Sequence, residues 1–231
     1  PIPPALMRDD ISIHRIPGKG VSLNRNNALS HCNADIILCA DDDLIYTPEG
    51  LKAVIDAFES HPEIDYATFR YSGSDHHIES EKRYPESECL ITGRLRNFCV
   101  CSFEIAIRRK LTEQGMRFDT RFGPGSTIAN GEDEMFFLTL KKKGFVGRFF
   151  PVTITHHNGL STGFRKITDP STAEGMGTVI GLTYPFSAPL RIPLKALRMG
   201  RSRQMPAIKA LYRLTRGWLR HLFITPPWKI I

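Results

Sequence analysis

The sequence predicts an α/β fold in which helices flank a sheet, and three observations lead to this prediction. Residues 36–40 form an apolar run that is typical of a strand buried on both faces. Apolar residues at helical spacing follow within residues 48–60, and residues 65–71 have the composition of a second strand. This strand–helix–strand order predicts a βαβ unit in a parallel sheet.

The chain has the length and composition of a globular protein. Its 231 residues, of which 41% are hydrophobic and 24% are charged, exclude a wholly disordered chain and suit one domain or one and a half. No apolar run approaches the roughly 18 residues that span a bilayer. The cysteines lack CxxC spacing, so we expect reduced thiols in a reducing compartment. They are Cys32, Cys39, Cys89, Cys99 and Cys101.

The elements around the apolar strand follow from local patterns. Residues 11–16 alternate apolar and polar side chains, which predicts a short strand, and a glycine-containing turn at 17–20 follows. Residues 22–31 predict a short helix. In the next helix, Thr47 is expected to be the N-cap and Pro48 the first helical residue, because proline lacks the N–H that the first turn leaves unpaired.

The middle of the chain continues with strands, helices and loops. Residues 72–90 are polar and predict a surface loop, and residues 98–114 predict a strand that runs into a short helix. Residues 130–143 predict a helix with acids in its first turn and lysines in its last, an arrangement that the helix dipole favours. Two short strands are expected within 146–156.

The positive charge is concentrated at the end of the chain. The net charge is +7, yet residues 191–231 contain ten Lys or Arg and no Asp or Glu, so the other residues carry a net charge of −3. Apolar residues recur at helical spacing among the basic ones, which predicts a basic amphipathic helix. We therefore expect a core at 1–165, a linker at 166–190 and a basic helical tail at 191–231.

Three interpretations of the tail are open: it lies on an anionic membrane, binds nucleic acid, or packs on the acidic body. We favour the membrane rather than nucleic acid, because apolar and aromatic side chains alternate with basic ones at helical spacing. The side chains expected in the lipid are Trp218, Leu219, Leu222, Phe223 and Trp228.

Three consecutive carboxylates end the apolar strand: Asp41, Asp42 and Asp43. They would repel one another in a dry site, but they are tolerated at the carboxyl edge of a sheet, where α/β folds bind ligands. A divalent cation that joins them to a phosphate would stabilise them further. The alternative is a solvated acidic turn.

Two further groups could carry chemistry. Glu132 and Asp133 open a helix after a glycine-rich loop, so they either stabilise the helix start or supply a general base. His156 and His157 end a predicted strand, and neutral imidazole binds divalent metals. Each of these histidines could equally be an ordinary core or surface residue.

In their order and separation these motifs resemble family 2 glycosyltransferases with the GT-A fold, over about residues 11–161. Residues 18–28 resemble the family's G-x-S-x-x-R-N segment, and residues 35–43 resemble its strand and DxD motif. Residues 131–137 resemble its ED motif, which is followed by a block that ends at a histidine. The resemblance implies a mixed, Rossmann-like GT-A sheet flanked by helices.

The resemblance also implies roles for individual residues. Asp133 would deprotonate the acceptor hydroxyl, with Glu132 shaping the site. Four side chains would contact the nucleotide-sugar: Arg25, Asn26, Asp41 and Asp42. Three would hold Mg²⁺ or Mn²⁺ against the diphosphate: Asp43, Asp41 and His156. His156 is preferred to His157 because it alternates with Val152 and Ile154 along the predicted strand.

The implied activity is that of an inverting glycosyltransferase. It would move a sugar from a nucleotide-sugar to a hydroxyl acceptor, a saccharide or a lipid-linked one, in cell-surface polysaccharide or glycolipid synthesis. It would work in the cytoplasm on the inner face of the membrane. The family's first two strand–helix units are not seen, so we expect residues upstream of Pro1 to be missing. The alternatives are a binding protein without activity and a metal-dependent nucleotide phosphohydrolase.

Overall fold

The apolar run that leads into the three aspartates forms β1 (Ile36–Leu38) at one end of a six-stranded sheet. The computed structural model describes residues 7–73, 84–92, 100–157 and 168–230. Within these residues the strand order is β1-β5-β3-β6-β2, and β4 pairs with β6. The other strands are β2 (Leu44–Tyr46), β3 (Tyr66–Gly73), β4 (Cys89–Leu90), β5 (Ile105–Arg108) and β6 (Gly147–His157).

The sheet is mixed, which corrects the parallel βαβ unit that the sequence predicts. β1 and β3 run in the same direction, but β5 lies between them and pairs with both in antiparallel register. β3 and β6 are parallel neighbours, while β2 and β4 pair with β6 in antiparallel register. β5 can occupy an interior position because Ile105 and Ile107 pack on one face of the sheet and Ala106 packs on the other.

Several helices follow the predicted patterns. α2 (Pro48–Ser60) begins after Thr47, whose Oγ1 accepts a 3.0 Å hydrogen bond from the Gly50 N–H. α4 (Glu132–Lys142) has three acids in its first turn and lysines in its last. α1 (Val21–His31) and α3 (Lys110–Glu113) also lie where helices are predicted. Residues 11–16, in contrast, form no strand.

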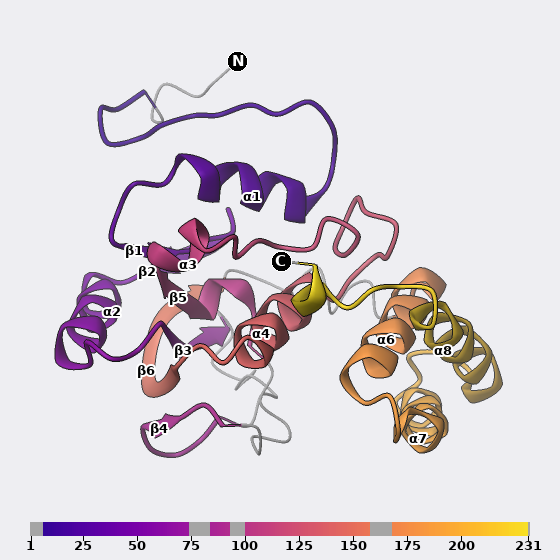
Figure 1. The fold of residues 1–231 in the computed structure, drawn as a ribbon. Coiled ribbons are helices and arrows are strands. Elements are labelled where there is room, and N and C mark those ends of the chain that lie inside the picture. Colours follow the sequence, from indigo (N-terminus) through magenta and orange to yellow (C-terminus); the bar gives the residue numbers. More distant parts are fainter. Residues whose placement is uncertain (1–6, 74–83, 93–99, 158–167, 231) are drawn as a thin grey trace.

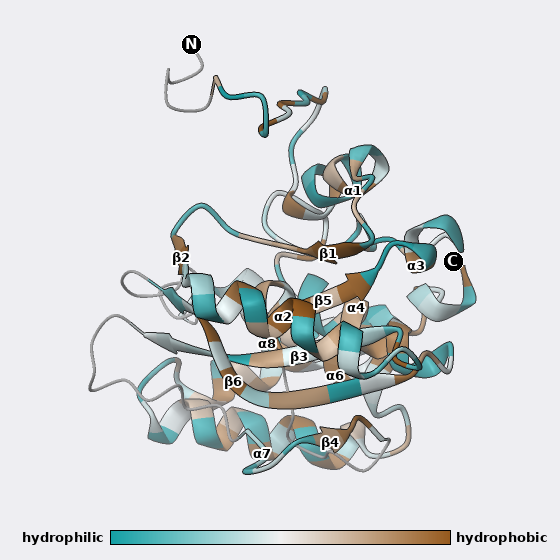
Figure 2. Ribbon diagram, turned by 90° about the vertical axis from the view of Figure 1, so that its left-hand side faces the viewer, coloured by the Kyte–Doolittle hydropathy of each residue, from teal (hydrophilic) through white to brown (hydrophobic). Residues whose placement is uncertain are grey.

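Helices cover both faces of the sheet (Figure 1). α2 packs on one face through Val54 and Phe58, which contact Phe69 of β3. α1 and α4 lie on the other face, where their apolar side chains pack with Tyr66 and Phe149. In Figure 2 the strands β1 and β5 are brown, which reflects their apolar sequences. The turn at Asp41–Asp43 follows β1 at the end of the sheet.

The stretch that the sequence divides into a linker and a tail contains three packed helices. They are α6 (Pro170–Thr183), α7 (Ala188–Arg201) and α8 (Ala207–His221), and we call residues 170–229 the helical module. Its core contains Ala173, Ile192, Met199, Ala210 and Leu214. α6 and α8 approach so closely that a Cβ on Gly217 would lie 1.7 Å from the Glu174 carbonyl oxygen.

The helical module is joined to the sheet domain through apolar contacts, and it lies beside α4 in Figure 1. Leu182 of α6 packs with Phe122 and Met135, and Trp228 of the 3₁₀ helix η3 (Pro227–Lys229) packs against the same cluster. Among the described residues, no helix is both long enough and apolar enough to cross a membrane.

Some predicted features fall outside the described residues. These are the start of the expected core at residues 1–6, the middle of the polar loop at 74–83, the start of the strand predicted from residue 98, Cys99, and the segment 158–167, which includes the end of the expected core.

Candidate functional site

α1 is fixed to the loop at 118–124 by hydrogen bonds to the loop's backbone. Asn26 donates from Nδ2 to the Phe118 carbonyl and accepts from the Phe118 N–H at Oδ1, both at 2.8 Å. Ser22 donates to the Phe122 carbonyl at 2.7 Å, and the Val21 N–H donates to the Pro124 carbonyl at 3.1 Å. Asn26, which the sequence assigns to the nucleotide-sugar, therefore uses both ends of its amide to hold this loop.

Arg25, on the same helix, joins the two acidic motifs. Its Nη2 donates to Oδ1 of Asp41 at 2.8 Å, and its Nη1 donates to Oδ1 of Asp133 at 2.9 Å. The guanidinium lies over the Phe118 ring, 5.3 Å from its centroid, and the side chain is only 10% exposed. Three residues that the sequence places in the site thus meet around one buried cation.

The electrostatic consequences follow from burial and charge. Burial alone would lower the pKa of Arg25, but the carboxylates of Asp133 and Asp41 outweigh it and raise the pKa above its ordinary value. Burial raises the pKa of the neighbouring Cys39 thiol to about 12, so this side chain is uncharged. Arg25 is consequently a permanent cation between two acids.

Glu132 and Asp133 begin α4 in different environments. The helix follows Gly131, which has a left-handed φ of 96°. Burial, with the charge of Asp133 next to it, raises the pKa of Glu132 to about 7. A Cβ on Gly123 would lie 3.1 Å from the Glu132 Cδ and 2.7 Å from Val21, so a glycine is required where the loop crosses this carboxyl group.

Asp43 lies against a histidine, but not the one that the sequence selects. The Nε2 of buried His157 is 3.2 Å from Oδ2 of Asp43. His156 points elsewhere, and its Nδ1 makes a short hydrogen bond with Ser72 Oγ. The pairing of β2 with β6 sets this arrangement, because Leu44 lies opposite His157 and places the preceding Asp43 beside it. Asp42 is exposed on the turn.

The alternation that favours His156 does not hold along β6. Val152 and Thr153 are both exposed, Ile154 and Thr155 are both buried, and the register with β3 shifts near Arg70. A β-bulge of this kind exchanges the faces of all later residues. It turns His157, and not His156, towards the acidic turn.

The acidic turn carries ligand atoms of the kinds that a divalent cation binds. Mg²⁺ and Mn²⁺ prefer carboxylate oxygens, and imidazole is also a common ligand for Mn²⁺. Asp43 and His157 have suitable atoms that already converge, whereas Asp41 is engaged by Arg25. No group of three or more acidic, histidine or cysteine side chains in the described residues could hold a metal. Asp43 and His157 would therefore supply only two ligands to a divalent cation.

Three residues of this region have contacts that the sequence analysis does not assign to them. It prefers His156 to His157, and it gives Phe118 no role beneath Arg25. Glu104 is fully buried and accepts a 2.6 Å hydrogen bond from the Cys101 N–H, while the Tyr84 hydroxyl also donates to it. A lone carboxylate inside the apolar stretch at 100–107 was the available signal, since a buried charge requires partners.

The chain is similar to known proteins in part of its sequence and in its fold. Residues 5–116 match the model of the family described as glycosyl transferase family 2. The structure resembles TarS 1–349 from S. aureus in complex with UDP, with a TM-score of 0.54 and 14% identity over 87% of this chain and 71% of that chain. The complex of TarS 1–349 with UDP-GlcNAc gives 0.53 and 14%, over 88% and 72%.

A structure of S. aureus TarS gives a TM-score of 0.50 and 15% identity, over 79% of this chain and 31% of that one. No curated protein matches the sequence. At these identities the structural similarity identifies the fold, a mixed sheet flanked by helices as in GT-A-like glycosyltransferases.

Proposed function

We propose that the chain, whose residues 5–116 match the model of glycosyl transferase family 2, transfers a sugar from a nucleotide-sugar donor to a hydroxyl group of an acceptor. The observation that carries this proposal is the bridge from Arg25 to both Asp41 and Asp133. This bridge brings a permanent cation and a carboxylate next to the acidic turn, which supports binding of a nucleotide diphosphate there. A sugar donor needs the first of these groups, and an acceptor hydroxyl needs the second.

In the proposed reaction Asp133 is the general base. Its Oδ1 accepts the hydrogen bond from Arg25, and its other carboxylate oxygen takes the proton of the acceptor hydroxyl. The acceptor oxygen forms a bond to the anomeric carbon as the bond from that carbon to the diphosphate breaks, and the electron pair leaves with the diphosphate. One base and a direct displacement give inversion at the anomeric carbon. Glu132 shapes the acceptor side.

The chain's own residues would assist the leaving group. Arg25 offsets negative charge near the diphosphate, with Asp41 and Asp42 at the edge of the nucleotide site. Asp43 and His157 would hold Mg²⁺ or Mn²⁺, which when bound neutralises charge on the diphosphate. The distance between Asp43 and His157 supports His157 over His156 as the second ligand.

The donor and acceptor classes are part of the same proposal. The similarity to structures of TarS with UDP and UDP-GlcNAc supports a uridine diphosphate sugar as the first donor to test. The basic helical module supports an acceptor held at a membrane, such as a lipid-linked saccharide in surface polysaccharide or glycolipid synthesis. The protein would then work in the cytoplasm, on the inner face of the membrane.

Calorimetry with UDP in the presence and absence of Mn²⁺ tests the donor site. The intact chain is expected to bind UDP more tightly with Mn²⁺ than without it, and Asp43→Ala should abolish that difference. Asp56→Ala is the matched control, because Asp56 is an acid on α2 that pairs with exposed Lys52. Failure of the intact chain to bind UDP, GDP or CDP would favour a binding protein of another kind. Hydrolysis of the nucleotide-sugar without any acceptor would favour a phosphohydrolase.

A further inference from the structure

α7 presents apolar side chains on two opposite faces. Ile192, Ala196 and Met199 are buried in the core of the helical module. Four other apolar side chains remain exposed, at 99, 69, 48 and 52%, and we call them the α7 stripe: Phe186, Leu190, Leu194 and Leu197. Leu190, Leu194 and Leu197 are spaced by four and three positions, which places them on one side of the helix, opposite the buried face, and Phe186 lies in the turn that precedes the helix.

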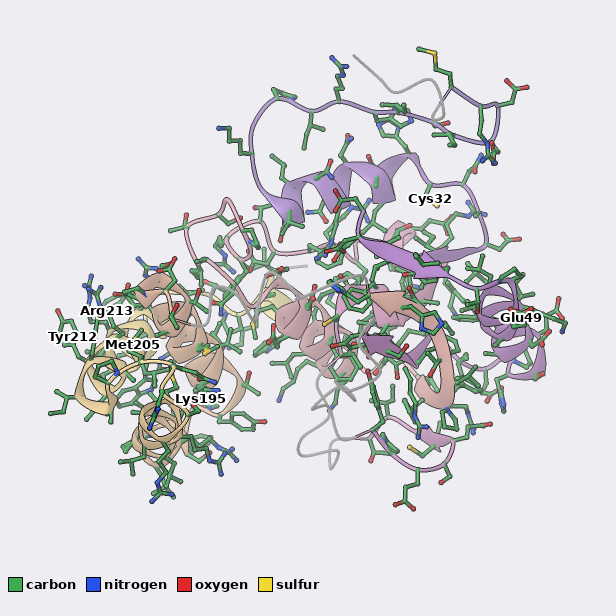
Figure 3. All side chains as sticks on the ribbon, turned by 180° about the vertical axis from the view of Figure 1, so that it is seen from behind. Cys32, Glu49, Lys195, Met205, Tyr212 and Arg213 are labelled. Carbon is green, nitrogen blue, oxygen red and sulfur yellow. The ribbon has the colours of Figure 1, made fainter. Side chains whose placement is uncertain are left out.

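α8 repeats this arrangement. Ala210 and Leu214 are buried against α6 and α7. The exposed apolar residues recur at helical spacing and continue past the helix end, and we call them the α8 stripe: Ile208, Tyr212, Leu219, Leu222 and Phe223. Figure 3 shows Tyr212 at the outer edge of the module, on the side away from the sheet.

Positive charge adjoins both stripes. The helical module contains ten Lys or Arg and a single acid, Glu174. That acid is already neutralised, because Arg213 contacts it at 2.6 Å and Arg216 at 3.5 Å. The guanidinium groups of the same two arginines lie 5.7 and 5.9 Å from the centroid of the Tyr212 ring. The exposed surface therefore combines apolar side chains with uncompensated cations.

We propose that the α7 and α8 stripes dock the protein on an anionic lipid surface, with the stripes in the interfacial layer and the flanking arginines at the headgroups. An anionic lipid surface would contact both the apolar stripes and the cations beside them, because the apolar side chains leave water and the cations meet anionic headgroups. A second copy of the chain would bring two like-charged modules together. A nucleic acid would pair with the arginines and leave the stripes in water.

The structure also changes which aromatic residues face the lipid. Trp218 packs against the core of the module, and Trp228 packs with Ile224 beneath Lys142, whose Nζ is 5.9 Å from its ring. Neither tryptophan belongs to the stripes, in contrast to the expectation from the sequence. The α7 stripe, whose residues are not among those expected in the lipid from the sequence, takes their place.

The two stripes would hold the acceptor of the proposed function at the membrane, and the docking surface rests on that function only in this respect. Lipid binding is measured without turnover. A protein that floats with vesicles but does not bind UDP would refute the catalytic proposal alone. A protein that binds UDP and does not float would refute the docking surface alone.

Flotation of the full chain with vesicles is the test. With phosphatidylcholine vesicles that contain about 30% phosphatidylglycerol, the protein should float, and with phosphatidylcholine alone it should float far less. Leu190→Ser/Leu194→Ser should weaken partitioning about tenfold, since two apolar side chains lose their contact with lipid. The matched control is Leu51→Ser/Ile55→Ser, an exposed pair with the same spacing on α2, which should float like the wild type.

The contribution of the basic side chains to lipid binding is tested by a second pair of variants. Arg198→Gln/Lys209→Gln should reduce flotation with the anionic vesicles, whereas Arg15→Gln/Lys19→Gln should not. All four variants change exposed residues, and circular dichroism verifies that each is folded. Wild-type flotation by Leu190→Ser/Leu194→Ser would overturn the proposal. So would a change of self-association by that variant in vesicle-free ultracentrifugation, because it would identify a second copy as the occupant.

Removal of residues 191–231 is a weaker test than these substitutions. It would delete most of α7 and all of α8, and so it would expose Ala173 and other buried residues of α6. A loss of flotation after truncation could then reflect unfolding of the helical module. The surface variants keep that core intact.

Discussion

Arg25 of α1 donates a 2.9 Å hydrogen bond to Asp133 of α4, across 108 positions of sequence. The same guanidinium reaches Asp41 at 2.8 Å, so one side chain connects the strand end, the helix α1 and the start of α4. Because this site is mostly shielded from water, the ion pairs stabilise the folded chain only if all three charges are present. Loss of any one of them leaves a buried charge without its counter-charge.

Loss of the cation should be costly. Arg25→Ala leaves Asp41 and Asp133 without their shared counter-charge, and it should lower the free energy of unfolding by about 3 kcal/mol, because an incomplete buried ion pair is strongly destabilising. Urea denaturation measures this value. Arg8→Ala, which removes an exposed partner of Asp10, should change it by less than about 0.5 kcal/mol. Equal effects of the two substitutions would contradict the bridge.

Glu132 should make the stability depend on pH near neutrality. Its pKa is about 7 in the folded chain and 4.5 as its ordinary value, so the folded state binds this proton more tightly. The resulting stabilisation is fully present below about pH 4.5 and is lost as the pH rises through 7. Glu132→Gln should remove this dependence of the free energy of unfolding on pH, as measured by urea denaturation between about pH 5 and about pH 8. Glu59→Gln, at an exposed position of α2, should keep it.

Asp133→Asn should separate binding from chemistry. The amide keeps the size of the side chain but cannot take the acceptor proton, so transfer should slow by about 10² to 10⁴ while UDP affinity stays within about twofold. Transfer from UDP-GlcNAc is followed as UDP release with a membrane extract as the source of acceptor. Asp56→Asn provides the control. Retention of full activity by Asp133→Asn would assign the base to another residue.

The two adjacent histidines should behave differently. His157→Asn removes the group beside Asp43 and should weaken Mn²⁺-dependent UDP binding about tenfold, as is usual for loss of one metal contact. His156→Asn should leave binding within about twofold of the wild type. Calorimetry compares them, after thermal melting has verified that both variants are folded. The reverse order of effects would restore His156, the residue favoured by the sequence.

The contact between α6 and α8 should tolerate no side chain at Gly217. An alanine Cβ there would lie 1.7 Å from the Glu174 carbonyl oxygen, so the helices must separate, at a cost of about 2–3 kcal/mol. Gly144→Ala is the comparison, since its Cβ would meet no atom within 4 Å and only its positive φ of 79° is strained, at about 1 kcal/mol. Thermal denaturation compares the melting temperatures of the two variants, and equal melting temperatures would indicate that α6 and α8 lie farther apart.

Local chemistry made parts of the fold predictable. Thr47 and Pro48 identify the start of α2, and the run of acids and lysines identifies α4, because capping and the helix dipole act within one element. The order of the strands in the sheet could not be predicted from such local patterns. β5 lies between β1 and β3, and its position depends on contacts between distant segments that no short pattern encodes.

The helical module illustrates a different limit. α6 contains Gly175, Gly177 and Gly181, which lower helix propensity and conceal the helical periodicity. Two of these glycines, Gly177 and Gly181, have a purpose that appears only in three dimensions, because α8 lies directly against them. For the candidate site, family motifs brought Arg25, Asp41 and Asp133 to attention, whereas the partner of Asp43 depended on an irregularity of β6.

The hydrogen bonds that tie α1 to residues 118–124 have a mechanical consequence. Asn26, Ser22 and Val21 each hold a different backbone group of the loop, so the helix that carries Arg25 and the loop that leads to Asp133 must move as one rigid piece. Any shift of α1 would therefore be transmitted to the loop that leads to Asp133. The same linkage constrains mutation, because a substitution that displaces the loop would also displace the helix that carries Arg25.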